Sequence, residues 1–197
     1  MRMYKVFRLL FATLLVLSTF FSNGVQAEGM TLDTISESWA KSKSQQKLFI
    51  ETSYDPLLEI RSTQKGKMIY RAPNTLEQHY DEPNKGTITF TDTLITLDFP
   101  NRKAEITTQS APVLAALSQT LLDLLRGDIK GLEQRFSVDF KNLNNQNWQI
   151  ILTPTALLKR HLDSITINGS EQTINNIVVT QISGEWRQIS FTDSVSP

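Results

Sequence analysis

The sequence contains no cysteine and only two histidines among its 197 residues. The absence of cysteine excludes disulfide bonds, thiolate zinc sites and cysteine nucleophiles. Two histidines are few for a histidine-based metal site or a catalytic triad. An excess of charge is missing too, because 20 Lys and Arg residues balance 20 Asp and Glu residues. This balance argues against the basic surface that nucleic-acid-binding proteins usually carry.

The sequence also lacks a hydrophobic run long enough to cross a membrane. The longest, 9–21, has 13 residues, which make about 20 Å of helix, and a bilayer core is about 30 Å thick. Basic residues precede this run, and small residues follow it at Val25 and Ala27, as in a secretory signal peptide. We therefore expect residues 1–27 to be a signal peptide cleaved near Ala27, and residues 28–197 to form a single exported domain. Removing the basic residues of this peptide leaves 17 basic and 20 acidic residues, a net charge of −3.

Most of the remaining chain consists of short β-rich runs separated by turn residues. Seven runs are expected first, at 47–53, 57–62, 66–71, 75–80, 87–91, 93–99 and 102–107, with a turn at Lys65-Gly66 between the second and the third. Five more are expected at 137–143, 148–153, 164–168, 173–180 and 185–192, with a turn at Asn168-Gly169. Such close spacing is typical of antiparallel strands and leaves no room for crossover helices.

Helical periodicity occurs in two places. Residues 31–45 carry apolar side chains at helical spacing, with Thr34 and Glu37 spaced as a capping box. Residues 111–126 form a longer apolar helix, in which leucines recur on one face. Gly127 is placed to cap its C-terminus, and Asp128 to begin a short second helix that reaches Phe136.

An antiparallel sheet of about 11 strands does not stay flat and open. We expect a mainly β (α+β) fold in which an incomplete barrel is closed by helices, and the helix at 111–126 is the only long apolar segment that could fill it. The mouth of such a barrel is a common ligand site. The one-faced apolar surface of the strands could equally form an ordinary solid core.

Catalytic groups are scarce. His79 is expected on an exposed strand face and His161 in a solvated charge cluster, while the neighbouring carboxylates of Asp81 and Glu82 should point apart. No serine lies in a glycine-rich elbow, and neither a phosphate-binding loop nor a metal-ligand spacing is present. We therefore expect a protein that is not an enzyme and that needs no cofactor, metal ion or nucleic acid.

The order of segments resembles the LolA family, the periplasmic carriers of outer-membrane lipoproteins. Residues 66–74 are similar to the family's Gly-x-Leu-x-x-x-Arg-Pro-Asn/Gly segment, and residues 92–97 to the hairpin that follows it. Residues 152–154 stand where the family has Leu-x-Pro after a strand, and residues 162–167 match the next strand in pattern. The family's arginine before proline, which ties the lid shut, corresponds to Ala72 here.

The resemblance implies an incomplete antiparallel barrel closed by helices, with a cavity for acyl chains. By this resemblance, the inward-facing, ligand-binding side chains are Met68, Tyr70, Ala72, Leu76, Leu114, Leu117, Leu121, Leu152, Ile165 and Ile167. The implied cargo is an acyl-chain lipid or lipoprotein. The implied partners are an inner-membrane exporter that donates the cargo and an outer-membrane acceptor, with the protein itself a monomer.

Two other functions stay open on the sequence. The same sheet could dock on an inner-membrane exporter without carrying cargo, which a large exposed apolar patch and no cavity would favour. A hydrolase would need a Ser–His pair within hydrogen-bond reach.

Overall fold

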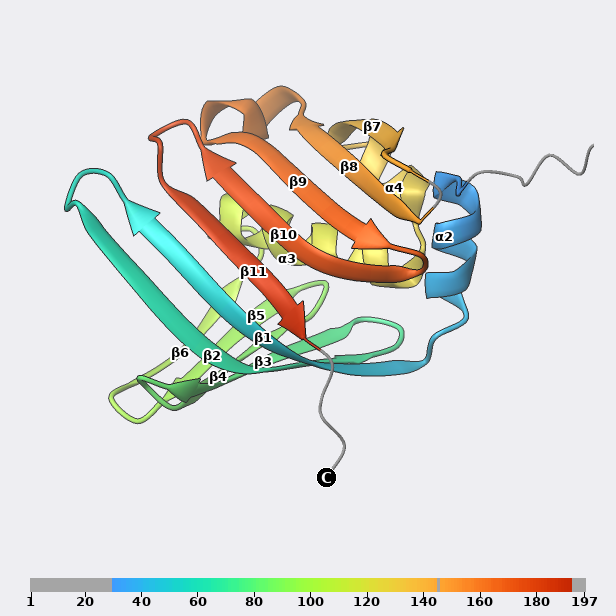
Figure 1. The fold of residues 1–197 in the computed structure, drawn as a ribbon. Coiled ribbons are helices and arrows are strands. Elements are labelled where there is room, and N and C mark those ends of the chain that lie inside the picture. The colour runs from blue at the N-terminus through green and yellow to red at the C-terminus, as the bar shows by residue number, and fades with distance from the viewer. Residues whose placement is uncertain (1–29, 145, 193–197) are drawn as a thin grey trace, which may run out of the picture.

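The computed structural model describes residues 30–144 and 146–192, apart from the side chains of five residues in two helical segments (112, 113, 117, 156 and 157). The expected signal peptide lies outside these residues. One antiparallel sheet of 11 strands forms the body of the molecule and curves into a half-barrel (Figure 1). The strands are β1 (Ser44–Asp55), β2 (Ile60–Arg71), β3 (Thr75–Glu82), β4 (Gly86–Phe90), β5 (Leu94–Phe99), β6 (Arg102–Thr107), β7 (Phe136–Asn142), β8 (Asn147–Pro154), β9 (Leu162–Ser170), β10 (Thr173–Gln181) and β11 (Trp186–Thr192).

The two end strands of the chain pair with each other in the middle of this sheet. The spatial order is β6-β5-β4-β3-β2-β1-β11-β10-β9-β8-β7, so β6 and β7 are the two free edges. The chain must pass from one edge to the other between β6 and β7, and it does so through α3 (Pro112–Arg126) and α4 (Ile129–Glu133) on the concave side (Figure 1). The expected mainly β, helix-covered incomplete barrel is confirmed.

Helix α2 (Leu32–Ala40) covers one end of the half-barrel, and the short 3-10 helix η1 (Ala156–Arg160) links β8 to β9. Thr31 and Thr34 form the capping box of α2, so the first cap lies three residues before the Thr34 expected from the sequence. Gly127 ends α3 in the left-handed conformation, as expected. Within the described residues, no helix is long and apolar enough to span a bilayer.

Gly127 also sets how closely α3 approaches α2. A Cβ at this position would lie 2.2 Å from the carbonyl oxygen of Ser36, in the middle of α2. Its φ of +69° is, in addition, a conformation that other residues adopt at a cost. Asp128 caps α4 by accepting a hydrogen bond from the backbone N–H of Gly131, but the helix ends at Glu133 and Phe136 begins β7.

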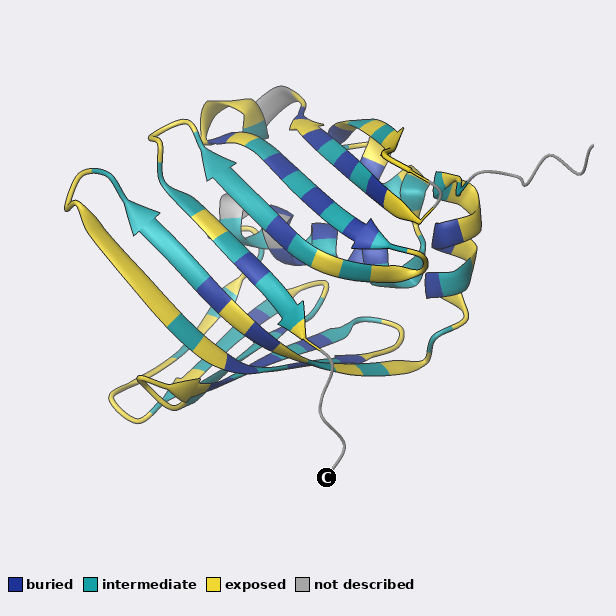
Figure 2. Cartoon of the chain, viewed as in Figure 1, coloured by how far each residue is buried: buried dark blue, intermediate teal, exposed yellow. Residues whose placement is uncertain are grey.

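The core consists of two apolar clusters, one in each half of the sheet. The cluster on β7 to β10 includes Trp148, Ile150 and Leu152 and packs against α2. The cluster on β1 to β5 includes Phe49, Leu76 and Ile95 and packs against α3. Buried residues alternate with less buried ones along β8 and most of β9 (Figure 2), as the period of a half-buried strand requires.

Two of the expected strands, 57–62 and 66–71, are a single strand in the structure. β2 runs without a break through Gly66, where a turn was expected. A Cβ on Gly66 would lie 1.9 Å from the carbonyl oxygen of His79, so the glycine allows β3 to approach closely beside a β-bulge. Asn168-Gly169 likewise lies inside β9, and the turn expected there falls at Glu171, which has a positive φ of 52°.

Candidate functional site

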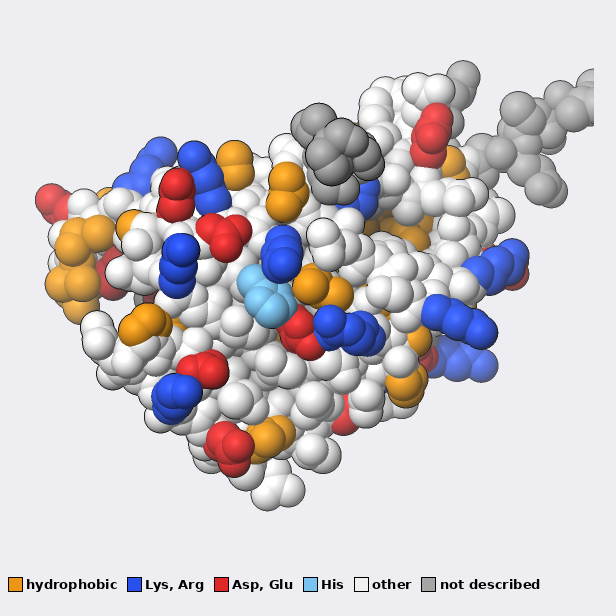
Figure 3. Space-filling view, turned by 90° about the horizontal axis from the view of Figure 1, so that it is seen from below, with side chains coloured by type: hydrophobic (Ala, Val, Ile, Leu, Met, Phe, Trp, Pro, Cys, Tyr) orange, Lys and Arg blue, Asp and Glu red, His pale blue; other side chains and the backbone are white. Residues whose placement is uncertain are grey.

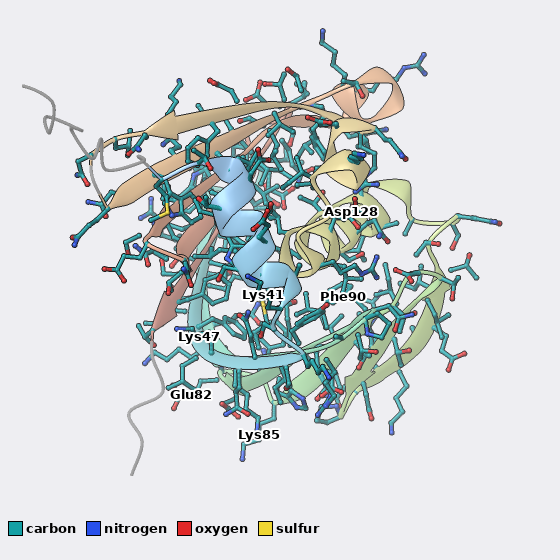
Figure 4. The ribbon with its side chains drawn as sticks, turned by 90° about the vertical axis from the view of Figure 1, so that its right-hand side faces the viewer. Lys41, Lys47, Glu82, Lys85, Phe90 and Asp128 are labelled. Carbon is teal, nitrogen blue, oxygen red and sulfur yellow. The ribbon has the colours of Figure 1, made fainter. Side chains whose placement is uncertain are left out.

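A cavity of about 440 Å³ lies between the sheet and the helices α2 and α3. Its walls come from β1 and β2, from β10 and β11, and from the C-terminal halves of the two helices. In Figure 4, α2 lies across the opening between the two halves of the sheet, with Lys41 at its end and Lys47 on β1 beneath it. The lining residues are Ser38, Trp39, Ser42, Gln45, Gln46, Lys47, Met68, Tyr70, Leu76, Leu121, Leu124, Leu125, Gln172, Thr173, Ile174, Ile177 and Phe191.

The lining separates into an apolar interior and a polar rim. The interior is built by side chains of the central strands and of α3, among them Leu76, Leu121 and Phe191. The rim consists of the glutamines and Lys47 at the start of β1, Ser38 of α2, Ser42 just after it, and the β9–β10 turn. An apolar cavity with polar groups at its mouth suits an amphiphile whose chain enters the cavity and whose head stays in water.

Four of the side chains expected from the sequence line this cavity together: Met68, Tyr70, Leu76 and Leu121. They come from β2, β3 and α3, which lie side by side on the concave face. Leu121 packs against both apolar clusters and so connects them at the cavity. Burial raises the pKa of Tyr70, an effect that the positive charge of Arg126 partly offsets.

The other expected residues lie elsewhere. Leu114 and Ile165 line a second, smaller hollow of about 60 Å³, which shares Leu121, Leu124 and Ile177 with the first cavity. Leu152 and Ile167 are fully buried in the β7–β10 cluster and line neither hollow, so they are ordinary core. Ala72 does not face inward: it is exposed and follows the end of β2, where the strand alternation no longer applies. The side chain of Leu117 lies outside the described part of the chain.

The arginine that holds the helix to the sheet comes from the helix, and it was not among the residues expected from the sequence. Arg126, in the last turn of α3, donates from Nε to the carbonyl oxygen of Pro73 at 2.5 Å. Its Nη2 donates to Oδ1 of Asp92, also at 2.5 Å. The partners lie 53 and 34 positions away in the chain, beyond the reach of any local pattern. The only available signal was a basic residue in the last turn of an apolar helix.

Asp92 is held ionised by this arrangement. Burial acts to raise its pKa, but the hydrogen bonds from Arg126 and from Asn74 outweigh burial, and the pKa lies below its ordinary value. Asn74 donates from Nδ2 to Oδ2 of Asp92 at 3.2 Å, so both oxygens are occupied. The β2–β3 and β4–β5 turns are therefore joined to each other and to the end of α3.

Helix α2 is fastened to the opposite half of the sheet. The indole N–H of Trp39 donates to the carbonyl oxygen of Gln172 at 2.8 Å, and the Ser38 hydroxyl donates to Oε1 of the Gln172 side chain at 2.7 Å. Trp39 also packs on Trp148, with ring centroids 5.7 Å apart. The two helices that cover the cavity are thus anchored to different halves of the half-barrel, with the cavity between the anchors.

A polar cluster bounds the apolar region toward the β1–β2 hairpin. The buried Glu51 accepts a hydrogen bond from the Tyr80 hydroxyl at 3.2 Å and pairs with Arg187 at 3.4 Å. Burial, together with the charge of Glu51, raises the pKa of Tyr80. The same residues form part of a separate polar groove of about 540 Å³. This cluster therefore marks the limit of the apolar surface on this side.

His79 is half-buried on the outer face and not exposed as expected. Its Nε2 lies 2.7 Å from Oε2 of Glu77, and its Nδ1 lies 3.3 Å from the Thr87 hydroxyl. Burial acts to raise the pKa of Glu77, but hydrogen bonds from His79 and Arg71 outweigh it and lower the pKa. Among the described residues, no group of three or more acidic or histidine side chains could hold a metal ion.

The fold and the site define a class of binding protein, in which a half-barrel encloses an apolar cavity under a helix. The family model described as outer membrane lipoprotein carrier protein LolA matches residues 41–196. The chain therefore belongs to the LolA family, as the resemblance indicated. Because that family is one of carriers and not of enzymes, the expectation of a non-enzymatic protein is confirmed. No individual curated protein matches the sequence.

Solved structures with a similar fold include three from different bacteria. A LolA superfamily protein from Nitrosomonas europaea is 12% identical, with 86% of this chain and 96% of that one covered and a TM-score of 0.45. A putative outer membrane lipoprotein-sorting protein domain from Vibrio parahaemolyticus is 9% identical, with 85% and 91% covered and a TM-score of 0.43. The MucA/MucB complex of Pseudomonas aeruginosa is 10% identical, with 84% and 58% covered and a TM-score of 0.44.

Proposed function

We propose that this protein is a periplasmic carrier that binds the acyl chains of a lipid or lipoprotein in the cavity beneath α2 and α3. The observation that supports this function is the apolar cavity of about 440 Å³ with its polar rim. Its size falls within the range of roughly 300–1,000 Å³ that is usual for small-molecule sites. Membership of a lipoprotein-carrier family supports the same function.

Burial of a hydrocarbon chain supplies enough free energy for binding without a specific polar contact. Each methylene transferred from water contributes about 0.8 kcal/mol, so about ten methylenes contribute about 8 kcal/mol before the losses of motion are counted. Cargo specificity then depends on what fits at the rim, where Gln45, Gln46 and Gln172 offer amide groups to a head group or a peptide.

Delivery requires that the cavity open or close in response to a partner. The anchors of the two helices provide a way to do so, because α2 is bonded to Gln172 and α3 to the turns around Pro73 and Asp92. Separating the two anchors would widen the cavity without breaking the sheet. We propose an inner-membrane donor and an outer-membrane acceptor as the partners. The protein would meet them after export directed by the signal peptide at residues 1–27.

The decisive experiment measures binding of a fluorescent fatty acid and of a synthetic triacylated lipopeptide to the purified protein. Leu121→Glu places a charge in the cavity wall and should weaken binding of both probes at least about tenfold. Leu143→Glu introduces the same charge at an exposed leucine of the β7–β8 turn and should leave binding unchanged. Circular dichroism melts of both variants establish that each is folded.

Native mass spectrometry of the purified wild-type protein gives an independent readout, because a carrier should retain or take up lipid. A wild-type protein that never takes up either probe would contradict the proposal and favour a cargo-free docking module. Equal binding by the Leu121→Glu and Leu143→Glu variants would show that the lipid binds somewhere other than in this cavity.

A further inference from the structure

The tip of the β1–β2 hairpin is apolar and exposed. Leu57 and Leu58 are 88% and 63% exposed, and Ile60 at the start of β2 is 53% exposed. Ile182, in the neighbouring β10–β11 turn, is 58% exposed. These four residues, here called the apolar tip, are four of the seven large hydrophobic side chains exposed within residues 30–144 and 146–192. They lie at the end of the sheet opposite α2 (Figure 1), where hydrophobic side chains project in Figure 3.

The tip is an ordered turn that holds its leucines outward. Oδ1 of Asp55 accepts hydrogen bonds from the backbone N–H groups of Leu57 at 2.9 Å and Leu58 at 3.1 Å. The β10–β11 turn lies against the hairpin, since a Cβ on Gly184 would be 3.6 Å from Cγ of Pro56. Presenting two leucines to water in a fixed turn is unfavourable for a free protein, so the arrangement suggests a partner that covers them.

Aromatic and basic side chains lie directly behind the tip. Tyr54 and Trp186 are opposite each other on β1 and β11, with ring centroids 6.3 Å apart. The Arg61 guanidinium lies 5.4 Å from the centre of the Trp186 ring. Tryptophan, tyrosine and arginine behind an apolar projection are the side chains that favour the boundary between head groups and acyl chains.

We propose that the apolar tip inserts into the surface of a phospholipid bilayer and so docks the protein on a membrane. A protein partner fits less well, because a stable protein interface takes about 20–30 residues on each side, whereas the tip offers four apolar side chains on two narrow turns. A bilayer accommodates a small convex projection of this kind. The docking end is remote from the cavity mouth under α2, so this role goes beyond the carrier function and does not depend on it.

The charges around the tip are of both signs. Ile182 donates its backbone N–H to the carbonyl oxygen of His161 at 3.0 Å, which brings the end of η1 next to the tip. The charged residues at the end of the β1–β2 hairpin, around the β10–β11 turn and around the end of η1 are four acidic and four basic. They are Asp55, Glu59, Arg61, Lys159, Arg160, Asp163, Glu185 and Arg187. Because they cancel, we expect insertion to be driven by apolar contact and to change less than twofold between low and physiological salt.

The test is co-sedimentation of the purified protein with vesicles of phosphatidylethanolamine and phosphatidylglycerol in a 3:1 ratio. The double variant Leu57→Ser/Leu58→Ser should partition at least about tenfold more weakly than the wild type. Leu143→Ser removes a leucine that is 57% exposed from another turn and should partition as the wild type does. Quenching of Trp186 fluorescence by brominated lipid should accompany binding and should disappear in Trp186→Phe.

Three results would overturn the proposal. The first is a wild-type protein that does not sediment with these vesicles, and the second is equal partitioning by the double variant. The third is a wild-type dimer that the double variant abolishes in the absence of lipid, which would make the tip a contact between copies. Fatty-acid binding by the double variant should be unchanged, so failure here is distinguishable from failure of the carrier function.

Discussion

Arg126 at the end of α3 and Asp92 in the β4–β5 turn form an ion pair of 2.5 Å that ties the covering helix to the sheet. The same guanidinium reaches the carbonyl oxygen of Pro73, one residue after Ala72. In the family pattern, an arginine precedes this proline and ties the lid from the strand side. Here the bond to the turn at Pro73 is made by Arg126, from the helix side.

Arg126→Ala should loosen this attachment. We expect a free energy of unfolding lower by about 1 kcal/mol, because the pair is partly exposed and screened by water. We also expect bound fluorescent fatty acid to exchange several times faster, measured by stopped-flow displacement. Arg71→Ala is the matched control, because Arg71 is exposed and pairs with Glu77 on the outer face. Equal exchange rates in the two variants would show that Arg126 has no role in retaining cargo.

The lowered pKa of Asp92 predicts how the attachment responds to acid. A carboxyl group whose pKa is lower in the folded protein stabilises the fold above its unfolded pKa of about 3.9 and loses this contribution as pH falls through the folded value. The wild type should therefore lose more stability than Asp92→Asn between pH 6 and pH 3, by an amount below about 1 kcal/mol. Urea unfolding at the two pH values measures the difference. Indistinguishable losses would show that the pair does not stabilise the fold.

Gly66→Ala tests why β2 is one continuous strand. The new Cβ would meet the carbonyl oxygen of His79 at 1.9 Å, and since both are backbone-fixed, β2 and β3 must separate locally. We expect a loss of at least about 2 kcal/mol in the free energy of unfolding. Thr63→Ala, at an exposed position of the same strand, should change it by less than about 0.5 kcal/mol. A Gly66→Ala protein as stable as the wild type would show that the sheet relaxes freely here.

The fold could be predicted largely from the sequence, because alternation and helical periodicity are local signals. The strand β6 was expected at 102–107 and is found at Arg102–Thr107, and Gly127 ends α3 as its position indicates. Gly66 was misinterpreted because the sequence alone does not distinguish a glycine that permits close approach of two strands from a glycine in a turn. Asn168-Gly169 was misinterpreted in a similar way, because Gly169 lies within a strand and makes room for the Trp148 ring, which a Cβ would meet at 2.0 Å.

The candidate site was predictable only in part. Strand alternation places Met68 and Tyr70 on one face, and the structure agrees. Ala72 lies beyond the alternation because the strand ends at Arg71, where the run 66–71 was expected to end, so only the family resemblance had placed it inward. Arg126 and Asp92 could not be paired at all, since their contact depends on how α3 crosses the concave face. Nor does alternation distinguish a residue that lines a cavity from one that fills the core.

Substitutions at Leu121 and Leu152 should distinguish a residue that lines the cavity from one that fills the core. Leu152 is fully buried among residues of β7 to β10, so Leu152→Ala leaves a void and should cost about 2–5 kcal/mol of stability. Leu121 borders an existing cavity, so Leu121→Ala enlarges a space that is already open and should cost less than half as much. Fatty-acid affinity should show the reverse order, with a several-fold loss in Leu121→Ala and no change in folded Leu152→Ala. Chemical denaturation and fluorescence titration of the two variants measure both quantities. A larger loss of affinity in Leu152→Ala would move the lipid site from the cavity under α2 into the β7–β10 half of the barrel.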